Sequence, residues 1–385
     1  MLNFSFHNPT KIHFGDGQIK MIANEIPANA NVLVIYGGGS IKHNGVYEQV
    51  VNALTEHTWF EFSGIEPNPS YDTLMKAQAI IAEKNIDYLL AVGGGSVVDG
   101  AKFIAAAALY EGEDPWDILA KQVPVKKALP IGAVLTLPAT GSESNGGSVV
   151  TRGGNKLPFG SPLVRPQFAV LDPKVTLSLS DRQISNGVVD AFIHIMEQYL
   201  TYSVNGKVQD RFAEGLLLTL IEEGPKALLA QSKEDLEVRA NIMWSATMAL
   251  NGLIGAGVPQ DWSTHMIGHE LTGAFGIDHA RTLSIILPAV MKVKRNEKHE
   301  KLVQFAERVW QLTDQDEAVK ISKAIALTED FFQRMNVPTR LSEVDITKDD
   351  IDGIIQKLEL HGMTQLGEHK DITLEVSQQI LELAL

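Results

Sequence analysis

Short apolar runs that end in glycine alternate with helical patterns along the first half of this 385-residue chain. The run at residues 31–36 (NVLVIY) is followed by glycines, as is the run at 88–92 (YLLAV), and a third run spans 131–137 (IGAVLTL). Helical spacing separates the first two runs, at residues 49–56 and 72–85. Strands that are apolar throughout and separated by helices are typical of a parallel sheet covered on both faces. We therefore predict a doubly wound α/β domain.

The pattern changes to long helices after about residue 172. Ser180 and Gln183 have the spacing of a capping box, which marks the start of a helix. Apolar residues then recur at helical spacing in residues 188–202, 210–223, 236–250, 321–335 and 374–383. Single hydrophobic cores stop growing beyond roughly 250 residues, so we expect two domains. We predict an α/β domain over residues 1–178 and an all-helical domain over 179–385, with a cleft between them.

Composition excludes several classes of partner. The chain has 33 basic and 47 acidic side chains, a net charge of −14, and no basic run, so we expect no nucleic-acid binding. Its longest apolar stretch, residues 103–110, is far shorter than the roughly 20 residues that span a bilayer, and no secretory signal is recognisable. The absence of cysteine excludes disulfides, thiolate catalysis and Cys-based metal sites. We predict a cytoplasmic protein that binds small molecules and no membrane.

Two glycine turns, at residues 37–40 and 93–100, each follow a predicted strand. Glycine between a parallel strand and a helix lets the backbone approach a phosphate, and the helix N-terminus supplies free N–H groups. A tight turn without a ligand is the alternative for one copy, but two copies favour phosphate binding. A third loop, residues 136–145, carries four hydroxyl groups after the third strand. Ligands of open α/β sheets bind beyond the carboxyl ends of the strands, so these loops should converge.

The first glycine turn also bears on the choice of cofactor. NAD enzymes usually hold the ribose 2′-hydroxyl with an acid after an early strand. Residues 37–40 contain no acid, and Lys42 is close in sequence. We interpret this as tolerance of a 2′-phosphate, and hence as a preference for NADP(H).

Several histidines lie at helical spacing from one another or from an acid in the second half of the chain. Asp190 and His194 are four residues apart, which places them on one helix face with Cβ atoms about 5 to 6 Å apart. His265 and His269 repeat this spacing, and His279 follows. Imidazole and carboxylate together suit one divalent ion such as Zn²⁺ or Fe²⁺. A zinc peptidase would carry the HExxH motif, which is absent here, so hydrolysis is disfavoured.

Four segments together resemble the iron-containing, or group III, alcohol dehydrogenase family: GGGSVVDGAK, TLPATGSES, DAFIH and HMIGHELTGAFGIDHA. The likeness runs through nearly the whole chain and is closest to the bacterial NADPH-dependent aldehyde reductase and butanol dehydrogenase branch. It implies an N-terminal doubly wound parallel-sheet dinucleotide-binding domain and a C-terminal all-helical metal-binding domain. It also implies a metal in the cleft between them, and family members commonly form homodimers.

The resemblance assigns roles to individual residues. The implied metal ligands are Asp190, His194, His265 and His279, and His269 matches a histidine near the reacting centre that does not bind the metal. The implied cofactor-binding residues are Gly38, Gly39 and Ser40 at the adenosine phosphate, Asn68 at the adenine, Gly94, Gly95 and Ser96 at the pyrophosphate, Asp99 and Lys156 beside the cofactor, and Thr136, Thr140 and Ser142 on the nicotinamide side. Pro158, two residues after Lys156, departs from the family pattern and affects only that assignment.

From these features we expect a metal-dependent oxidoreductase that mainly reduces short- or medium-chain aldehydes to primary alcohols. The metal would act as a Lewis acid on the carbonyl oxygen while hydride arrives from NADPH, with His269 as a proton relay. One alternative is a lyase or cyclase related to dehydroquinate synthase. A sugar-phosphate substrate would then need a basic cluster, and residues 190–280 carry few basic side chains. The other alternative is a non-catalytic binding protein whose histidines are structural.

Overall fold

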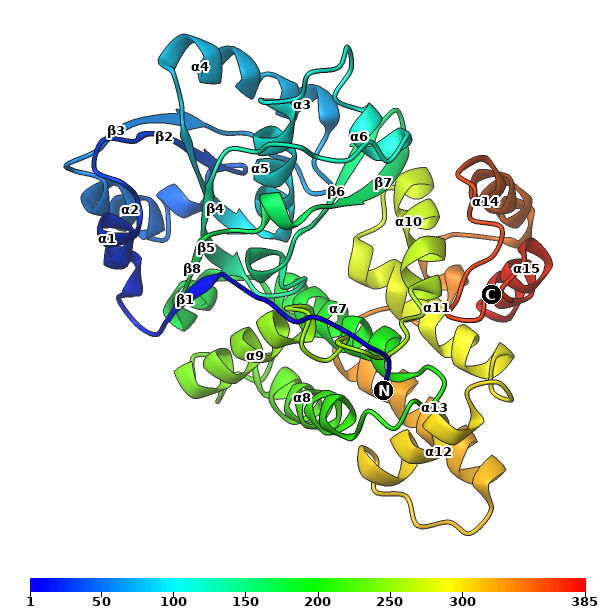
Figure 1. Ribbon diagram of the computed structural model, residues 1–385. Helices are drawn as coiled ribbons and strands as arrows, with labels where there is room; N and C mark the ends of the chain where they lie inside the picture. Colours follow the sequence, from blue (N-terminus) through cyan, green and yellow to red (C-terminus); the bar gives the residue numbers. More distant parts are fainter. The chain divides into compact units, whose positions relative to one another are not determined.

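The computed structural model describes residues 1–385, and the chain divides into two compact units (Figure 1). The α/β unit comprises residues 7–179 and 234–247. The helical unit comprises residues 1–6, 180–233 and 248–385. No helix is both long and apolar enough to cross a lipid bilayer.

A six-stranded sheet with only parallel pairs forms the centre of the α/β unit. Its strands, in spatial order, are β1 (Lys11–Phe14), β8 (Phe168–Leu171), β5 (Ile131–Leu137), β4 (Tyr88–Gly94), β2 (Asn31–Tyr36) and β3 (Thr58–Phe62). The predicted parallel α/β sheet is confirmed. The predicted limits of β2 and β5 hold, and β4 extends two residues beyond the prediction, to Gly94.

Alternate residues of the central strands pack into two separate hydrophobic cores, one on each face of the sheet. Because both faces are buried, these strands are apolar throughout. Val32 and Val34 of β2 belong to one core, with residues of η1 and α1 and with Val46 of α2. Leu33 and Ile35 belong to the other, with residues of α3, α4 and α5. The elements involved are η1 (Gln18–Met21), α1 (Ile22–Glu25), α2 (Val46–Ala53), α3 (Tyr71–Met75), α4 (Ala77–Lys84) and α5 (Gly95–Ala107).

One sequence prediction in this unit needs correction. The helix predicted over residues 72–85 is two helices, α3 and α4, which meet at Lys76.

The segment that contains Lys156 and Pro158 forms strand β7 (Asn155–Gly160), which pairs antiparallel with β6 (Gly147–Arg152). The turn is Gly153-Gly154, and both glycines have the positive φ that tight hairpin turns require. Pro158 is compatible with a two-stranded ribbon, where a strand has a free edge.

Helix α7 (Asp181–Tyr199) is buried along most of its length, and the buried part includes the polar side chains of Asp190, His194 and Glu197. The capping box of Ser180 and Gln183 is present at its start. Helix α11 packs against both α7 and α10. The helices of this unit are α7, α8 (Lys207–Lys226), α10 (Ser263–Phe275), α11 (His279–Val293), α12 (His299–Arg308), α13 (Glu317–Arg334), α14 (Lys348–Leu360) and α15 (Leu374–Leu383).

The remaining elements are short or lie in the α/β unit. Helix α9 (Leu236–Ala249), which the sequence predicts, belongs to that unit except for its last two residues. The short helices are α6 (Asp117–Ala120), η2 (Ser40–Lys42), η3 (Ser142–Ser144), η4 (Pro162–Val164), η5 (Pro173–Ser178) and η6 (Leu341–Val344).

Candidate metal and cofactor sites

The chain reverses its direction of progress across the sheet between β2 and β4. After β2 it adds β3 on one side, and it then returns to add β4 on the other side. Such a switch point is where open α/β sheets bind ligands, beyond the carboxyl ends of the strands. Both predicted glycine segments lie there: residues 37–40 follow β2, and residues 93–100 span the end of β4 and the first turns of α5.

The turn between β4 and α5 is packed too tightly for side chains. A β-carbon at Gly94 would lie 3.1 Å from the Leu137 Cβ, and one at Gly95 would lie 2.6 Å from the Thr140 Oγ1. The second glycine turn, at residues 93–100, therefore contacts the third predicted loop, at residues 136–145. This contact agrees with the prediction that the loops at this edge of the sheet converge. Helix α5 begins at Gly95, so its first N–H groups are available to an anion at this position.

Three predicted cofactor residues from distant parts of the chain lie together beside this turn. Ser96 Oγ accepts a hydrogen bond from the Asn68 N–H at 3.4 Å. The Lys156 ammonium donates to the Asn68 Oδ1 at 2.9 Å. Asn68 has a positive φ of 57°, a conformation that asparagine tolerates better than most residues. The hairpin thus brings a largely buried cation to the glycine turn.

Asp99 and Ser142, both predicted near the cofactor, bind each other. The Ser142 hydroxyl donates to Asp99 Oδ1 at 2.5 Å, and the Val149 N–H donates to Asp99 Oδ2 at 2.9 Å. Lys102, which sequence reasoning missed, donates to Ser142 Oγ at 2.8 Å and to the Gly147 carbonyl at 2.7 Å. Burial lowers the pKa of Lys102 to about 8. This network ties α5 to the loop after β5 and to β6.

The turn after β2 carries a charged cluster of its own. Ser40 and Gly38 are exposed, and Lys42 pairs with Glu61 of β3 at 3.1 Å. Glu61 also accepts hydrogen bonds from the hydroxyls of Tyr36 and Tyr47. Sequence reasoning missed Glu61, because it reaches this turn through strand pairing rather than through sequence proximity.

Three of the four predicted metal ligands come together in the helical unit. Asp190 lies on α7, His265 on α10 and His279 at the start of α11. One carboxylate oxygen and one nitrogen from each histidine lie within 4.8 Å of one another. Asp190 and His265 are buried, and the side chain of His279 is 20% exposed.

Asp190 provides a test of whether these residues suit a cation. Its Oδ1 is buried and forms no hydrogen bond. A buried carboxylate oxygen without a donor is costly unless a positive charge compensates it. Histidine nitrogens with a carboxylate oxygen are a donor set that suits Zn²⁺ and Fe²⁺. The residues present therefore fit a divalent metal ion.

His194 and His269 flank this group of three. The Nδ1 of His194 lies 2.8 Å from the Asp190 backbone carbonyl, which leaves Nε2 as the nitrogen available to a ligand. Its ring centroid is 4.3 Å from that of His265. The His269 ring centroid lies 5.0 Å from that of His279. Burial lowers the pKa of His194, which favours the neutral imidazole that metals bind.

Glu197 is a further residue of this site that sequence reasoning missed. Its buried carboxylate accepts a hydrogen bond from the Nδ1 of His265. Burial and the nearby charge of Asp261 raise the pKa of Glu197, whereas the hydrogen bonds from the Thr264 and His265 N–H groups act in the opposite direction and favour the carboxylate. The available signal was an acid three residues after His194, in the same segment DAFIHIMEQY as two predicted ligands.

Models of one protein family match both parts of the chain. "Iron-containing alcohol dehydrogenase" matches residues 9–173, and "Fe-containing alcohol dehydrogenase family, C-terminal" matches residues 184–385. The NADPH-dependent aldehyde reductase YqhD of Escherichia coli K12 is 57% identical over 390 residues, which cover all of both chains.

Solved structures show the same fold. A crystal structure of Escherichia coli K-12 YqhD has a TM-score of 0.98 at 56% identity, covering 100% of this chain and 99% of that one. The NADH-dependent butanol dehydrogenase A of Thermotoga maritima has a TM-score of 0.95 at 37% identity, with the same coverage.

Proposed function

Because this chain belongs to the iron-containing alcohol dehydrogenase family, we propose that it reduces short- or medium-chain aldehydes to primary alcohols with NADPH. The observation that carries this proposal is the group of Asp190, His265 and His279, whose ligand atoms lie within 4.8 Å of one another. The extent of identity to an NADPH-dependent aldehyde reductase, 57% over the full length, supports the choice of reaction and cofactor.

We assign the metal to Asp190, His194, His265 and His279. When bound, a divalent cation supplies Lewis-acid polarisation of the substrate carbonyl, and the reduced nicotinamide supplies hydride. Asp190 contributes the negative charge of the ligand set, and its Oδ1 has no competing hydrogen bond. Either Zn²⁺ or Fe²⁺ suits this set.

The glycine turn after β4 is assigned to the pyrophosphate, with Gly94, Gly95 and Ser96 at the N-terminus of α5. The other residues proposed to contact the cofactor are Gly38, Gly39 and Ser40 at the adenosine phosphate, Asn68 at the adenine, Thr136, Thr140 and Ser142 on the nicotinamide side, and Asp99 and Lys156 beside it. The hydrogen bond from Lys156 to Asn68 holds that lysine at the turn. Asp99 accepts a hydrogen bond from the Ser142 hydroxyl and thereby fixes the position of that side chain.

His269 is assigned to proton delivery, because its ring lies 5.0 Å from that of His279 without belonging to the group of three ligand atoms. Replacing it with alanine should lower kcat for aldehyde reduction and change the pH dependence of the rate. A His269→Ala enzyme with unchanged pH–rate behaviour would remove this role.

The test of the proposed function is NADPH oxidation with butanal. The purified protein is stripped with a chelator, reloaded with Zn²⁺ or Fe²⁺, and assayed with NADPH and, in parallel, with NADH. We expect turnover that depends on added metal and is at least about tenfold more efficient with NADPH. Equal activity of the stripped and reloaded protein would contradict the metal-dependent mechanism, and no turnover of any aldehyde would contradict the reaction.

We also propose that the chain forms a homodimer and acts in the cytoplasm. Light scattering of the purified protein should then give about twice the 42.1 kDa mass of one chain. A mass near that of the single chain would contradict the dimer.

A further inference from the structure

We infer that Glu197 is a positioning residue, which fixes the ring of His265 and thereby sets the affinity of the metal site. This inference rests on the proposed function, because it takes His265 as a metal ligand. It concerns a residue that does not itself belong to the proposed ligand set.

Glu197 binds the first turn of the helix that carries His265. Its carboxylate accepts hydrogen bonds from the Thr264 N–H at 2.6 Å and from the His265 N–H at 3.3 Å. The first N–H groups of a helix have no partner within the helix, and a negative charge at this end is favourable. α10 starts at Ser263, and no side chain of its own caps it. A glutamate of α7 therefore caps α10.

The same carboxylate also contacts the side chain of His265. It accepts a hydrogen bond from the Nδ1 of the ring. A histidine that donates from Nδ1 keeps its lone pair on Nε2, the nitrogen that is then able to bind a metal. Glu197 thus holds both the backbone and the imidazole of His265, and it selects the tautomer that a metal needs.

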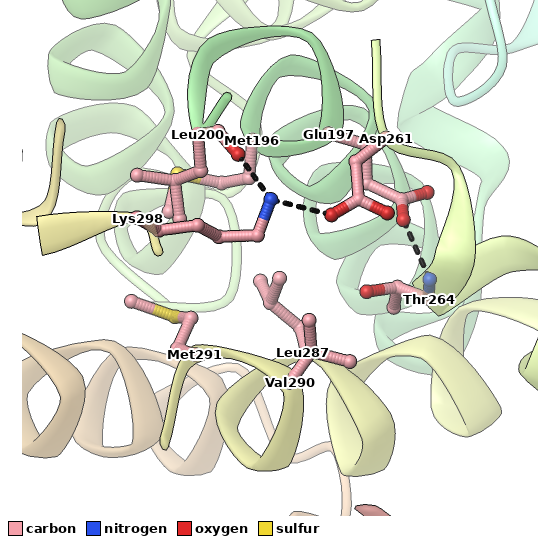
Figure 2. A pocket seen from close by; sticks show the side chains of 9 residues that line it. All are labelled: Met196, Glu197, Leu200, Asp261, Thr264, Leu287, Val290, Met291 and Lys298. Atoms are coloured by element: carbon pink, nitrogen blue, oxygen red, sulfur yellow. Dashed lines mark hydrogen bonds and ion pairs between the residues drawn. The ribbon is translucent and has the colours of Figure 1, made fainter. Parts of the chain in front are cut away.

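The segment before α10 is fixed by a second set of contacts, around a small pocket (Figure 2). The ammonium of Lys298 lies 2.6 Å from the Asp261 carboxylate and 2.9 Å from the Glu368 carboxylate, and it donates to the Leu200 carbonyl at 2.7 Å. Asp261 in turn accepts from the Ser263 N–H at 2.8 Å and donates its own N–H to the Glu197 carbonyl at 2.9 Å.

Between these anchors the backbone adopts a conformation that a large side chain rarely takes. Trp262 has a φ of 65°, and such strain persists only where the surroundings determine it. Its indole ring lies edge-on to His265, with centroids 5.3 Å apart. His265 is therefore held by Glu197 on one side and by a fixed, strained segment that precedes it.

A purely structural role for Glu197, as a helix cap, makes a different prediction from a positioning role. Losing a helix cap lowers the free energy of unfolding by about 1 kcal/mol. It does not by itself change how the His265 ring nitrogens bind a metal. Losing a carboxylate that orients a metal-bound histidine typically lowers metal affinity about 10- to 100-fold. Metal affinity, measured without substrate or cofactor, separates the two roles.

The experiment titrates the metal-free protein with Zn²⁺ in competition with a fluorescent chelator. Glu197→Gln keeps the shape of the side chain and removes its charge. The matched control is Glu214→Gln, because Glu214 is a buried acid of the same unit that binds Tyr199 at 3.0 Å and Gln304 at 2.8 Å. We expect about 10- to 100-fold weaker Zn²⁺ binding for Glu197→Gln and wild-type binding for Glu214→Gln. The visible absorption of bound Co²⁺ should change only in Glu197→Gln.

Wild-type Zn²⁺ affinity and an unchanged Co²⁺ spectrum in Glu197→Gln would overturn the inference. If that variant does not fold, as judged by circular dichroism, nitrogen-15 NMR of the wild-type imidazoles decides instead. The Nδ1–H tautomer of His265 in the zinc-loaded protein supports the inference, and the Nε2–H tautomer overturns it. These measurements use no aldehyde, so weak metal binding in Glu197→Gln supports the inference even if the wild type fails to reduce butanal.

Discussion

Gly95 lies against Thr140 so closely that a β-carbon at residue 95 would come within 2.6 Å of the threonine hydroxyl oxygen. This approach joins the turn after β4 to the loop after β5, and it brings the N-terminus of α5 into the region proposed for the cofactor. Glycine is needed here because any side chain would collide with Thr140. The backbone angles do not require it, since Gly95 has no positive φ.

Replacing Gly95 with alanine should therefore weaken cofactor binding. The new methyl group must displace the Thr140 side chain from the turn. Because Thr140 belongs to the region proposed for the cofactor, we expect the KM for NADPH to rise at least about tenfold, which corresponds to about 1.4 kcal/mol. The checks are steady-state kinetics and titration of NADPH fluorescence. Gly215→Ala is the control, because residue 215 lies within α8 with nothing within 4 Å of an added β-carbon.

The control variant carries an expectation of its own. Alanine in a helix interior is about 0.8 to 1 kcal/mol more favourable than glycine, so Gly215→Ala should be more stable to urea with an unchanged KM. An unchanged KM for NADPH in Gly95→Ala would show that the pyrophosphate does not depend on this turn.

Asp190 should be essential for turnover but not for cofactor binding. Asp190→Asn removes the negative charge of the proposed ligand set, and metal ions in such sites supply several kcal/mol of stabilisation. We expect kcat/KM for butanal to fall at least about 100-fold, while the dissociation constant for NADPH changes less than about twofold. Asp181→Asn, an exposed acid at the start of the same helix, should behave as wild type.

Metal analysis gives an independent check of this assignment. Asp190→Asn should retain less zinc or iron after dialysis than Asp181→Asn does. Full metal content together with normal kinetics in Asp190→Asn would place the metal elsewhere.

Sequence patterns predicted those strands whose own residues are apolar throughout. Strand β2 is buried on both faces, and its apolar run predicted its limits to the residue. The strands that sequence reasoning missed are short or lie at an edge of the sheet: β3 mixes Glu61 with aromatic residues, and β1 and β8 have four residues each. The Gly153-Gly154 pair was a usable signal for the β6–β7 hairpin.

The proposed metal site shows the same limit. The i, i+4 spacing predicted that Asp190 and His194 share a helix face, because that relation is local. The spacing gives no information about tertiary packing. It does not predict that α11 packs against α7 and α10, the contacts that bring His279 close to Asp190 and His265. Glu197 escaped notice for this reason. An acid within a helix usually faces solvent, and only the packed structure shows that this one faces His265.

Ser40→Asp should reduce the preference for NADPH over NADH. The nearby carboxylate of Glu61 is already paired with Lys42 and with two tyrosine hydroxyls, whereas an aspartate at the exposed position 40 would add an unpaired charge. At a separation of 4 Å, two charges repel by about 1 kcal/mol in water and about 4 kcal/mol near a protein surface. We expect the KM for NADPH to rise at least about tenfold, with a smaller change for NADH.

Ser40→Ala serves as the control for this variant, because it removes the hydroxyl without adding charge. It should weaken NADPH binding by only about threefold. An equal loss of efficiency with both cofactors in Ser40→Asp would show that residue 40 is not near the 2′-position of the ribose.

Asp114 should stabilise the α/β unit in a way that disappears in acid. Partial burial alone would raise the pKa of its carboxyl, but hydrogen bonds from Arg152 at 2.7 Å and Tyr71 at 2.6 Å outweigh burial and lower the pKa to about 2. A group whose pKa is lower in the folded state than its usual 3.8 stabilises the fold above that value. The contribution is lost as the pH falls from about 4 to about 2.

The comparison of wild type with Asp114→Asn by urea unfolding tests this dependence. The Asp114 side chain is 40% exposed, so we expect a loss of at most about 1 kcal/mol at pH 7. The difference should shrink at pH 3, because the Asp114 carboxyl of the unfolded chain, with its usual pKa of 3.8, is then mostly protonated and must release that proton on folding. Asp352→Asn, at an exposed position of α14, should show no such difference at either pH. A gap between wild type and Asp114→Asn that stays constant from pH 7 to pH 3 would mean that packing, rather than the charge of Asp114, holds Arg152 and Tyr71 in place.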